Sequence, residues 1–309
     1  MRDGSVTFDP IQAAADLTRQ VSPATLVRNN EPLAKRTTLR VGGPADLYVE
    51  PATEADLALT LQFCGIHQLP LFILGRGSNL LVRDRGFRGV VICLCRGFAG
   101  VKVEGGKLRC GAGARLKAVA MEAKRHGLAG LEFLEGIPGS VGGGLRMNAG
   151  AMGGAMFDIV ESVRVMDFAG QAHDRGAGSM QVAYRACSTL KTEIALEAVL
   201  RGRTAPTDQI EQRLAEFSKR RWESQPAASS AGCMFKNPPT IPAGKLIDEL
   251  GLKGTRVGGA MVSMEHGNFL INSGNATARD VLELIERVRS RARADRGIEL
   301  ETEVEIIGE

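Results

Sequence analysis

The segment Gly136-Ile137-Pro138-Gly139-Ser140-Val141-Gly142-Gly143-Gly144, closely followed by Asn148-Ala149-Gly150, is the most unusual stretch of this 309-residue sequence. Five of its first nine residues are glycine, and none is acidic. A glycine within regular structure costs about 0.5–1 kcal/mol relative to alanine. A run of this kind is understandable if the backbone must lie close against an extended ligand, such as the pyrophosphate of a dinucleotide.

A second glycine segment, Gly75-Arg76-Gly77-Ser78-Asn79, follows the apolar strand predicted at Leu71–Leu74. Its glycines would let backbone N–H groups approach a phosphate, while Ser78 and Asn79 add polar partners and Arg76 adds positive charge. A tight turn between two strands would explain the same residues. The segment by itself leaves both interpretations open.

Glycine is enriched in the whole chain, with 38 residues, or roughly 12% against a usual ~7%. Ten lie within residues 75–113 and ten within 127–154, whereas residues 203–231 contain none. Apolar residues at helical spacing, Ile210, Leu214 and Phe217, follow in that last stretch. We therefore expect a domain boundary near 203–207.

The remaining pattern predicts a mixture of helices and strands. Helices are expected at 53–68, 115–126, 245–250 and 277–296, and strands at 71–74, 89–94, 162–168, 194–203, 260–263 and 269–272. Gly105-Gly106 predicts a hairpin, and the alternation of residues 298–307 predicts a final strand with Glu299, Glu301, Glu303 and Glu305 on one face. Because no regular βαβ repeat is present, we expect an α+β fold of two lobes plus a cap domain, and no doubly wound sheet.

One further glycine pattern resembles the start of a dinucleotide-binding fingerprint. Gly111-Ala112-Gly113 opens a helix, but it follows a hairpin strand and Leu116 occupies the place of the third glycine. That fingerprint needs its βαβ context, so we reject a Rossmann NAD(P) site here. The sequence also lacks the glycine-Lys pattern of a phosphate-binding loop.

Composition excludes several other classes of function. A net charge of +4 and 5% aromatic residues argue against a nucleic-acid partner. Six cysteines and four histidines show no zinc-ligand spacing, so no metal site is expected. No apolar run is long enough to span a membrane, and Met1–Gly4 lacks the start of a signal peptide, so a cytoplasmic location is expected.

An ordered set of motifs gives the chain a specific resemblance. The motifs are Thr37-Thr38-Leu39-Arg40-Val41-Gly42-Gly43-Pro44-Ala45, Gly75–Leu81, Gly136–Gly150, Tyr184-Arg185 with Ser188, Ala231-Gly232-Cys233-Met234-Phe235-Lys236-Asn237-Pro238, Gly251–Ser263, Asn268–Asn272 and Leu300-Glu301-Thr302-Glu303-Val304. Over residues 37–308 the chain resembles the UDP-N-acetylenolpyruvoylglucosamine reductase (MurB) family of flavoenzymes. Cys233 lies 48 positions after Arg185, and this short separation resembles the shorter subtype, which lacks a tyrosine-bearing substrate loop.

The resemblance implies a two-lobed FAD-binding domain of the PCMH or vanillyl-alcohol-oxidase type over residues 20–204. A C-terminal α+β substrate-binding domain would occupy residues 205–309. It also implies that NADPH is the hydride donor and that the enolpyruvyl ether of UDP-N-acetylglucosamine is reduced to UDP-N-acetylmuramate for peptidoglycan synthesis. The partner is then a small nucleotide-sugar, and the chain is expected to be a monomer or a weak homo-oligomer.

The resemblance implies three catalytic residues. Arg185 would stabilise negative charge on the substrate carboxylate, Cys233 would give a proton to the carbon next to the one that receives hydride, and Glu303 would be a second catalytic group. The family usually has Ser where this chain has Cys233. A thiol, with an ordinary pKa near 8.5, is a stronger acid than an alcohol, so the replacement is chemically reasonable, with an expected sensitivity to oxidation and alkylation.

The implied binding residues form two sets. Those for FAD are Arg40, Gly75, Arg76, Gly77, Ser78, Asn79, Gly136, Ile137, Pro138, Gly139, Ser140, Gly142, Gly143, Asn148, Ala149 and Gly150. Those for substrate are Tyr184, Arg221, Lys236, Asn237 and His266. Arg221 is only the cation nearest to the position where the family has a basic residue, and His266 would serve equally well as the cap of a turn.

Each catalytic residue also has a simpler interpretation. Arg185 could be an ordinary surface arginine, Cys233 a small buried apolar residue, and Glu303 one of several solvated carboxylates. For the whole protein, the alternatives are an oxidase or dehydrogenase of a sugar or hydroxy acid on the same FAD scaffold, and a flavin- or UDP-sugar-binding protein without turnover.

Overall fold

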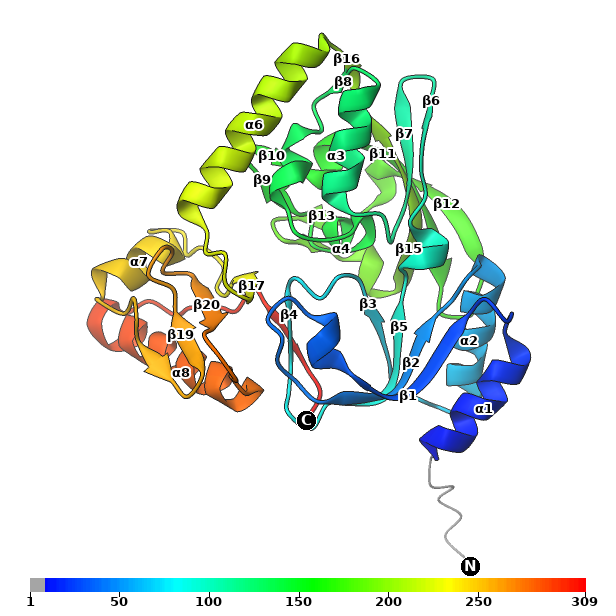
Figure 1. Cartoon of the computed structure of the whole chain (residues 1–309), viewed down its shortest axis with the longest axis horizontal. Coiled ribbons are helices and arrows are strands. Elements are labelled where there is room, and N and C mark those ends of the chain that lie inside the picture. The colour runs from blue at the N-terminus through cyan, green and yellow to red at the C-terminus, as the bar shows by residue number, and fades with distance from the viewer. Residues whose placement is uncertain (1–8) are drawn as a thin grey trace, which may run out of the picture.

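The computed structural model describes residues 9–309, so the expectation about a signal peptide at Met1–Gly4 falls outside the described residues. Figure 1 shows three parts around a common centre: a first lobe at lower right, a second lobe at the top and a C-terminal domain on the left. No helix within residues 9–309 is long and apolar enough to cross a membrane.

The first lobe is a mixed sheet covered by two helices. Its elements are α1 (Pro10–Gln20), β1 (Leu26–Pro32), β2 (Pro44–Glu50), α2 (Glu54–Ile66), β3 (Leu71–Leu74), β4 (Leu80–Val82) and β5 (Phe87–Cys93). The sheet order is β1-β2-β5-β3, in which β1 and β2 are antiparallel and the other two pairs are parallel. Leu17 of α1 and Leu57 of α2 pack in one cluster with Leu47 and Val90 of the sheet. The Thr53 hydroxyl accepts the Asp56 N–H at 3.1 Å, which confirms the predicted start of α2.

The second lobe is an antiparallel sheet with short helices on one face. Its elements are β6 (Val101–Glu104), β7 (Lys107–Gly111), α3 (Leu116–Arg125), β8 (Leu128–Ala129), α4 (Val141–Arg146), β9 (Gly150–Ala151), β10 (Gly154–Ala155), α5 (Met156–Ile159), β11 (Val160–Asp167), β12 (Ala172–Gly176), β13 (Val182–Ala183), β14 (Ala186–Cys187), β15 (Glu193–Arg201) and β16 (Arg203–Thr204). The main sheet has the order β12-β11-β15-β7-β6. The predicted hairpin at Gly105-Gly106 is confirmed, with both glycines at positive φ.

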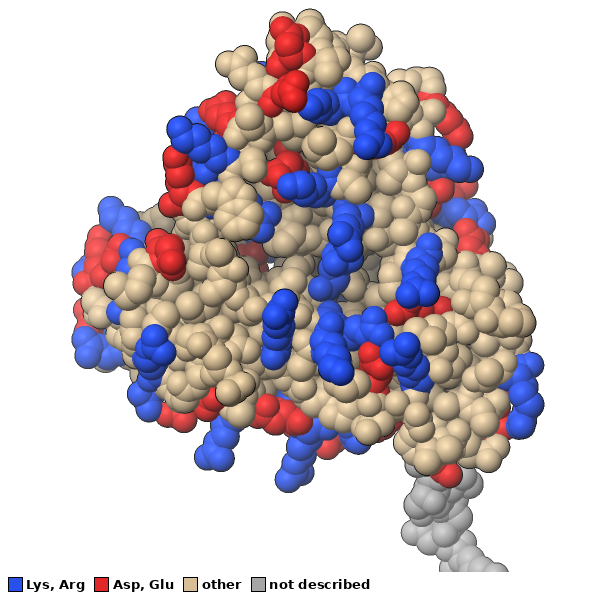
Figure 2. All heavy atoms as spheres, in the orientation of Figure 1, with Lys and Arg blue, Asp and Glu red and all other residues tan. Residues whose placement is uncertain are grey.

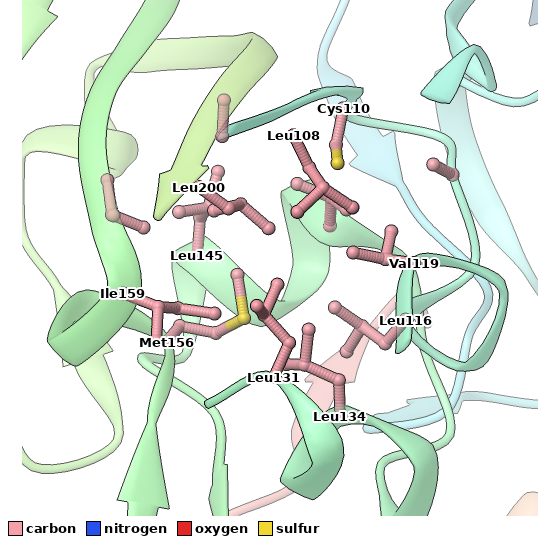
Figure 3. Close-up of a cluster of buried hydrophobic side chains, with 14 of the residues drawn as sticks. Leu108, Cys110, Leu116, Val119, Leu131, Leu134, Leu145, Met156, Ile159 and Leu200 are labelled. Carbon is pink, nitrogen blue, oxygen red and sulfur yellow. The ribbon is translucent and has the colours of Figure 1, made fainter. Parts of the chain in front are cut away.

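The core of the second lobe holds the glycine-rich segment in place (Figure 3). Leu145 of α4 packs in one cluster with Leu108 and Leu200 of the sheet. Leu134 of the 3-10 turn η3 (Glu132–Gly136) and Leu131, which precedes that turn, belong to the same cluster. Leu145 and Leu134 are fully buried. The segment 137–140 between η3 and α4 is therefore fixed at both ends by apolar packing.

The long helix α6 (Thr207–Ser224) begins at the predicted boundary. Its buried residues Ile210 and Leu214 pack into the core of the second lobe, and Lys124 of α3 pairs with Glu211 at 2.6 Å. The proposed division at 204/205 remains a prediction. The helix α6 packs against the second lobe. It also connects that lobe to the C-terminal domain, as Figure 1 shows.

The C-terminal domain is a small antiparallel sheet covered by two helices. Its elements are β17 (Ser230–Cys233), α7 (Ala243–Glu249), β18 (Arg256–Val257), β19 (Ala260–Val262), β20 (Phe269–Asn272), α8 (Ala278–Arg296) and β21 (Glu305–Ile307). The sheet order is β17-β20-β19-β18. Thr277 and Asp280 form the reciprocal capping box expected at the start of α8. Leu39, Val41 and Leu81 of the first lobe join the core of this domain.

The predicted final strand over residues 298–307 is wrong for most of its length. Only β21 is a strand, and it pairs in parallel with β4 of the first lobe. The preceding segment must pass from one domain to the other. It first pairs with the C-terminal domain, where the Glu303 N–H donates to Met234 O at 2.8 Å, and then with the first lobe, where the Glu305 N–H donates to Asn79 O at 3.2 Å.

As a result, the four glutamates of this segment do not share one face. Glu299 pairs with Arg293 and Glu301 pairs with Lys236 at the surface, whereas Glu303 turns inward toward Arg185. The alternation in the sequence could not distinguish Glu303 from its neighbours, but its side chain alone among the four meets a partner from the second lobe.

Replacement of Leu145 by alanine should destabilise the protein by about 2–5 kcal/mol, because it removes a fully buried side chain and leaves a cavity. Urea denaturation followed by circular dichroism measures the change. Ile66→Ala is the control, since Ile66 is 78% exposed and should change stability by no more than about 0.5 kcal/mol. Equal midpoints for the two variants would contradict the assignment of this core.

Candidate active site

The two glycine segments lie side by side, although they belong to different lobes. A Cβ atom placed on Gly75 would lie 2.9 Å from Ser140 Oγ, and one placed on Gly139 would lie 3.5 Å from Ser78 Oγ. The segment containing Gly75 connects β3 to β4, and the segment containing Gly139 connects η3 to α4. The fold therefore brings the two predicted cofactor segments together, with hydroxyl groups and bare backbone facing one another.

The glycines here are of two kinds. A Cβ on Gly77 would lie 2.5 Å from Arg36 O, so the packing of the chain itself requires a glycine there. A Cβ on Gly136 would meet nothing within 4 Å, and one on Gly139 or Gly143 would make only ordinary contacts, the nearest at 3.5 and 3.7 Å. These three positions leave the backbone open to a bound group, as the segment's composition predicted.

An unpartnered hydroxyl lies at the same place. Thr37 is buried, and its Oγ1 has no hydrogen-bond partner among residues 9–309. A Cβ on Gly77 would lie 2.7 Å from Thr37 Cα, so this hydroxyl adjoins the first glycine segment. A buried polar atom without a partner is costly. The opposed loops therefore fit an extended polar cofactor that would supply a hydrogen-bond partner for Thr37. Thr37 was not among the FAD-binding residues expected from the sequence, and we add it to the candidate contacts.

The other predicted cofactor residues differ in exposure and in the bonds that they already make to the protein. Arg40 and Arg76 are exposed, and Arg40 has a positive φ of 59°. Asn79 donates from Nδ2 to Glu303 O at 3.1 Å, and Asn148 accepts the Phe157 N–H at 3.2 Å, so both amides already hold protein segments together. The remaining members lie on the second glycine segment or just after it: Ile137, Pro138, Gly142, Ala149 and Gly150.

The rejected pattern Gly111-Ala112-Gly113 packs behind the second glycine segment. A Cβ on Gly111 would lie 2.1 Å from Phe98 O, and one on Gly113 would lie 2.2 Å from Leu94 O. These glycines permit close contact between two protein backbones. The Gly142 N–H donates to Ala112 O at 2.8 Å, so the pattern supports the candidate cofactor loop from behind.

The three predicted catalytic residues come together from three separate elements. Arg185 lies in the tight turn between β13 and β14, Cys233 ends β17, and Glu303 lies in the segment that leads to β21. Arg185 Nε is 2.9 Å from Glu303 Oε1, and both side chains are largely buried. The Glu303 N–H donates to Met234 O, which places Glu303 beside the residue that directly follows Cys233.

Burial controls the charge state of this group. It raises the pKa of the Cys233 thiol to about 11, an effect that the Glu303 charge strengthens and the Arg185 charge opposes. Burial also raises the pKa of Glu303 above its ordinary value, against the opposing effect of Arg185. At neutral pH Cys233 is therefore a thiol that holds its proton, beside a cation and a carboxyl group. This buried environment also argues against the expected sensitivity of Cys233 to oxidation and alkylation, because those reactions need the thiolate.

Arg185 is held in an unfavourable backbone conformation. Its φ is 55°, and Asn148 and Met152 nearby in the second lobe also have positive φ values. The Arg185 Nε–H is not aimed at the Glu303 oxygen despite the short distance, and it has no hydrogen-bond partner among the described residues. A Cβ on Gly150 would lie 3.5 Å from Arg185 Nη1, so the guanidinium lies against the cofactor segment. Strain of this kind clusters at functional sites.

The predicted substrate residues surround this group to different degrees. Tyr184 is 60% exposed, with the Arg185 guanidinium over its ring at 5.1 Å. Lys236 pairs with Glu301, and Arg221 donates from Nη1 to Gly136 O at 2.9 Å. Asn237 Oδ1 accepts the Ala243 N–H at 3.0 Å. His266 Nδ1 accepts the Asn268 N–H at 3.1 Å, which is the turn-capping arrangement.

Asn268 is a residue that we did not single out from the sequence. It is buried, its Nδ2 donates to Phe235 O and its Oδ1 accepts the Phe235 N–H, both at 2.8 Å. Its backbone carbonyl accepts the Met234 N–H at 2.8 Å. These three bonds fix the backbone directly after Cys233. The only signal in the sequence was the position of Asn268 within a matching motif.

The charge on the surface suits an anionic ligand. On the face drawn in Figure 2, Lys and Arg side chains gather along the middle of the molecule, where the three parts adjoin in Figure 1, and acidic side chains lie mainly toward the outline. Within residues 9–309, no group of three or more His, Cys, Asp or Glu residues could hold a metal ion.

Comparison with known proteins identifies the family. A family model described as the C-terminal domain of UDP-N-acetylenolpyruvoylglucosamine reductase matches residues 225–307, and one described as an FAD binding domain matches residues 45–175. A reductase of this name from Symbiobacterium thermophilum is 45% identical over 284 residues, which cover 91% of this chain and 92% of that protein. One from Heliobacterium modesticaldum is 46% identical over 283 residues, covering 90% of each chain.

This chain belongs to the UDP-N-acetylenolpyruvoylglucosamine reductase family. The crystal structure of the enzyme from Thermus caldophilus superposes with a TM-score of 0.80 at 40% identity, over 92% of this chain and 99% of that one. The resemblance seen in the sequence and the predicted α+β architecture, with a two-lobed FAD-binding domain and a C-terminal domain, are confirmed. FAD as the cofactor of this reductase family is confirmed with them.

Gly139→Ala should weaken FAD binding by about tenfold or more, equivalent to ~1.4 kcal/mol, while the unliganded protein keeps its stability. The added methyl group would lie between the two loops, yet its nearest protein atoms are at 3.5 and 3.7 Å. Fluorescence titration of the apoprotein with FAD measures the affinity. Gly178→Ala is the matched control, because a Cβ there meets nothing within 4 Å. Unchanged affinity in Gly139→Ala would place the cofactor elsewhere.

Proposed function

We propose that Arg185, Cys233 and Glu303 deliver the proton and stabilise the charge in the reduction that gives this family its name. As a member of the family, the chain is an FAD-dependent oxidoreductase of peptidoglycan precursor synthesis. Its reaction converts UDP-N-acetylglucosamine enolpyruvate to UDP-N-acetylmuramate with NADPH as reductant. The observation that supports the assignment of roles is the meeting of a partly buried thiol, a guanidinium and a carboxyl group from three separate elements.

When bound, FAD would supply the two-electron chemistry by which hydride passes from NADPH to the terminal carbon of the enolpyruvyl group. The residues that would hold it are those of the two opposed glycine segments, together with Thr37. Ser78 and Ser140 offer hydroxyls toward the gap between the loops.

Cys233 holds a proton on Sγ at neutral pH and would give it to the substrate carbon next to the carboxylate. As that carbon gains carbanion character, negative charge develops on the carboxylate oxygens. The unpartnered Nε–H of Arg185 is a donor for those oxygens. Glu303, when protonated, would donate a second hydrogen bond, and the rise in its pKa favours that form.

The substrate residues are proposed from their position around this group. Tyr184 and Lys236 lie next to Arg185 and Cys233 in the chain and remain partly accessible. Asn237, His266 and Arg221 would act mainly by shaping the surrounding loops, because each already bonds to the protein backbone.

Several broader features remain proposals. They are the domain limits 20–204 and 205–309, the shorter subtype, a cytoplasmic location and a monomeric or weakly associated state. The location is supported by the chemistry, because a nucleotide-sugar and NADPH are metabolites of the cytoplasm.

One coupled assay distinguishes this function from its alternatives. Consumption of NADPH that depends strictly on UDP-N-acetylglucosamine enolpyruvate supports the reductase. A sugar oxidase or dehydrogenase on this scaffold would instead reduce its flavin with a sugar or hydroxy acid, and a binding protein would show ligand binding without turnover.

Cys233→Ala should slow the oxidation of the reduced enzyme by substrate about 10²–10⁴-fold, because the carbon loses its proton donor. Reduction of the flavin by NADPH should keep its rate. Stopped-flow absorbance of the flavin measures the two half-reactions separately. Cys233→Ser is the control and should retain most of the activity, since an alcohol can donate in the same position. If Cys233→Ala leaves both half-reactions unchanged, Cys233 is not the donor.

The rate of that second half-reaction should stay constant from pH 7 to about 9.5 in the wild-type enzyme. Cys233 donates only while protonated, and a pKa of about 11, well above the ordinary thiol pKa near 8.5, keeps most of it protonated over this range. Cys233→Ser should show the same profile. A fall near pH 8.5 that is present in the wild type and absent in Cys233→Ser would show that the thiol is not shielded as the structure indicates.

A further inference from the structure

A pair of cysteines separate from the three predicted catalytic residues lies at the end of the first-lobe sheet. Cys93 is the last residue of β5, and Cys95 follows one residue later. Their Sγ atoms are 2.9 Å apart. Of the other cysteines, Cys64, Cys110 and Cys187 are free and buried, and Cys233 belongs to the candidate active site.

The backbone holds the two sulfurs on the same side. The Cys95 N–H donates to Cys93 O at 3.0 Å, which turns the chain at Leu94. Cys93 is only 6% exposed, whereas Cys95 is partly exposed. Cys95 is therefore the cysteine of the pair that is accessible to solvent, while Cys93 is shielded. This is the arrangement of an attacking and a resolving cysteine.

The two thiols differ in acidity because they interact. The two sulfurs lie within hydrogen-bond distance, and this contact lowers the pKa of Cys95 and raises that of Cys93. The backbone N–H of Arg96 also favours the Cys95 thiolate, whereas burial and the nearby Glu50 carboxylate oppose it. Tyr48, whose hydroxyl donates to Glu50 at 2.9 Å, faces Cys93 from β2.

We propose that Cys93 and Cys95 form a redox dithiol that hydroperoxides convert to an intramolecular disulfide. The Cys95 thiolate attacks one peroxide oxygen, the O–O bond breaks, and the leaving oxygen takes a proton to form water or an alcohol. Cys95 is then a sulfenic acid. Cys93 attacks its sulfur, the S–S bond forms, the S–O bond breaks and a water molecule leaves. The two thiols lose two electrons and two protons, and the peroxide takes them up.

Peroxide should oxidise the Cys93–Cys95 pair in preference to Cys233, because the two sites differ in thiol acidity. A thiol whose pKa is about 11 is ionised to roughly one part in 10⁴ at pH 7, so Cys233 reacts slowly with peroxide. Cys95, which is partly exposed as Cys233 is, has a pKa that is lowered instead of raised. The two side chains take no part in the proposed proton transfer, although Cys93 Sγ donates to Gly75 O at 3.6 Å and so adjoins the first glycine segment.

The test uses the purified holoenzyme and hydrogen peroxide. Trypsin cuts after Arg88 and Arg96, so the peptide Gly89–Arg96 contains both cysteines and no other. After brief treatment with a few equivalents of peroxide, denaturation and alkylation with iodoacetamide, this peptide should be unalkylated and lighter by two hydrogen atoms. Dithiothreitol added before alkylation should restore double alkylation. Cys233 should remain alkylated throughout.

Two variants separate the steps. In Cys93→Ser, dimedone should trap a sulfenic acid on Cys95, since the resolving thiol is gone. In Cys95→Ser, Cys93 should barely react. Cys64→Ala is the control and should leave disulfide formation unchanged. The proposal is overturned if the wild-type peptide stays doubly alkylated while Cys233 is oxidised, or if the disulfide links two molecules; the wild-type measurement decides this even if a variant fails to fold.

Discussion

Glu303 is bonded to all three parts of the molecule, and the geometry of the site depends on these bonds. Its carboxylate pairs with Arg185 of the second lobe, its backbone N–H donates to Met234 of the C-terminal domain, and its carbonyl accepts from the Asn79 amide of the first lobe. The segment then enters the first lobe as β21, beside β4. One residue thus sets the positions of the first glycine segment, the guanidinium and the thiol relative to one another.

The Arg185–Glu303 ion pair positions the site more than it stabilises the fold. Burying two charges costs desolvation free energy that their attraction only partly offsets. Arg185 also occupies a left-handed backbone conformation that is unfavourable for most residues other than glycine. A chain selected for stability alone would gain from an apolar pair here. Burial instead leaves the Arg185 Nε–H without a partner and raises the pKa of Glu303, and both effects prepare the pair for a substrate that carries negative charge.

Local elements were largely predictable from the sequence because their causes are local. The capping box at Thr277, the hairpin at Gly105-Gly106 and the apolar strand before Gly75 each depend on residues a few positions apart. The segment 298–304 was mispredicted because its backbone partners, Met234 and Asn79, come from distant parts of the chain. The glycines show the same limit. Gly113 and Gly139 look alike in the sequence, but only the structure shows that Gly113 accommodates another backbone while Gly139 faces open space.

The cysteines extend this argument to chemistry. Cys95 and Cys233 have the same side chain, yet a neighbouring thiol makes the first more acidic, whereas burial and Glu303 make the second less acidic. Holding the proton firmly does not prevent Cys233 from donating it. A carbon that gains carbanion character beside a carboxylate becomes a far stronger base than a thiolate, so proton transfer to it stays favourable even from a thiol with a pKa of about 11. The raised pKa therefore keeps Cys233 protonated between turnovers, and the substrate carbon becomes the base that removes the proton.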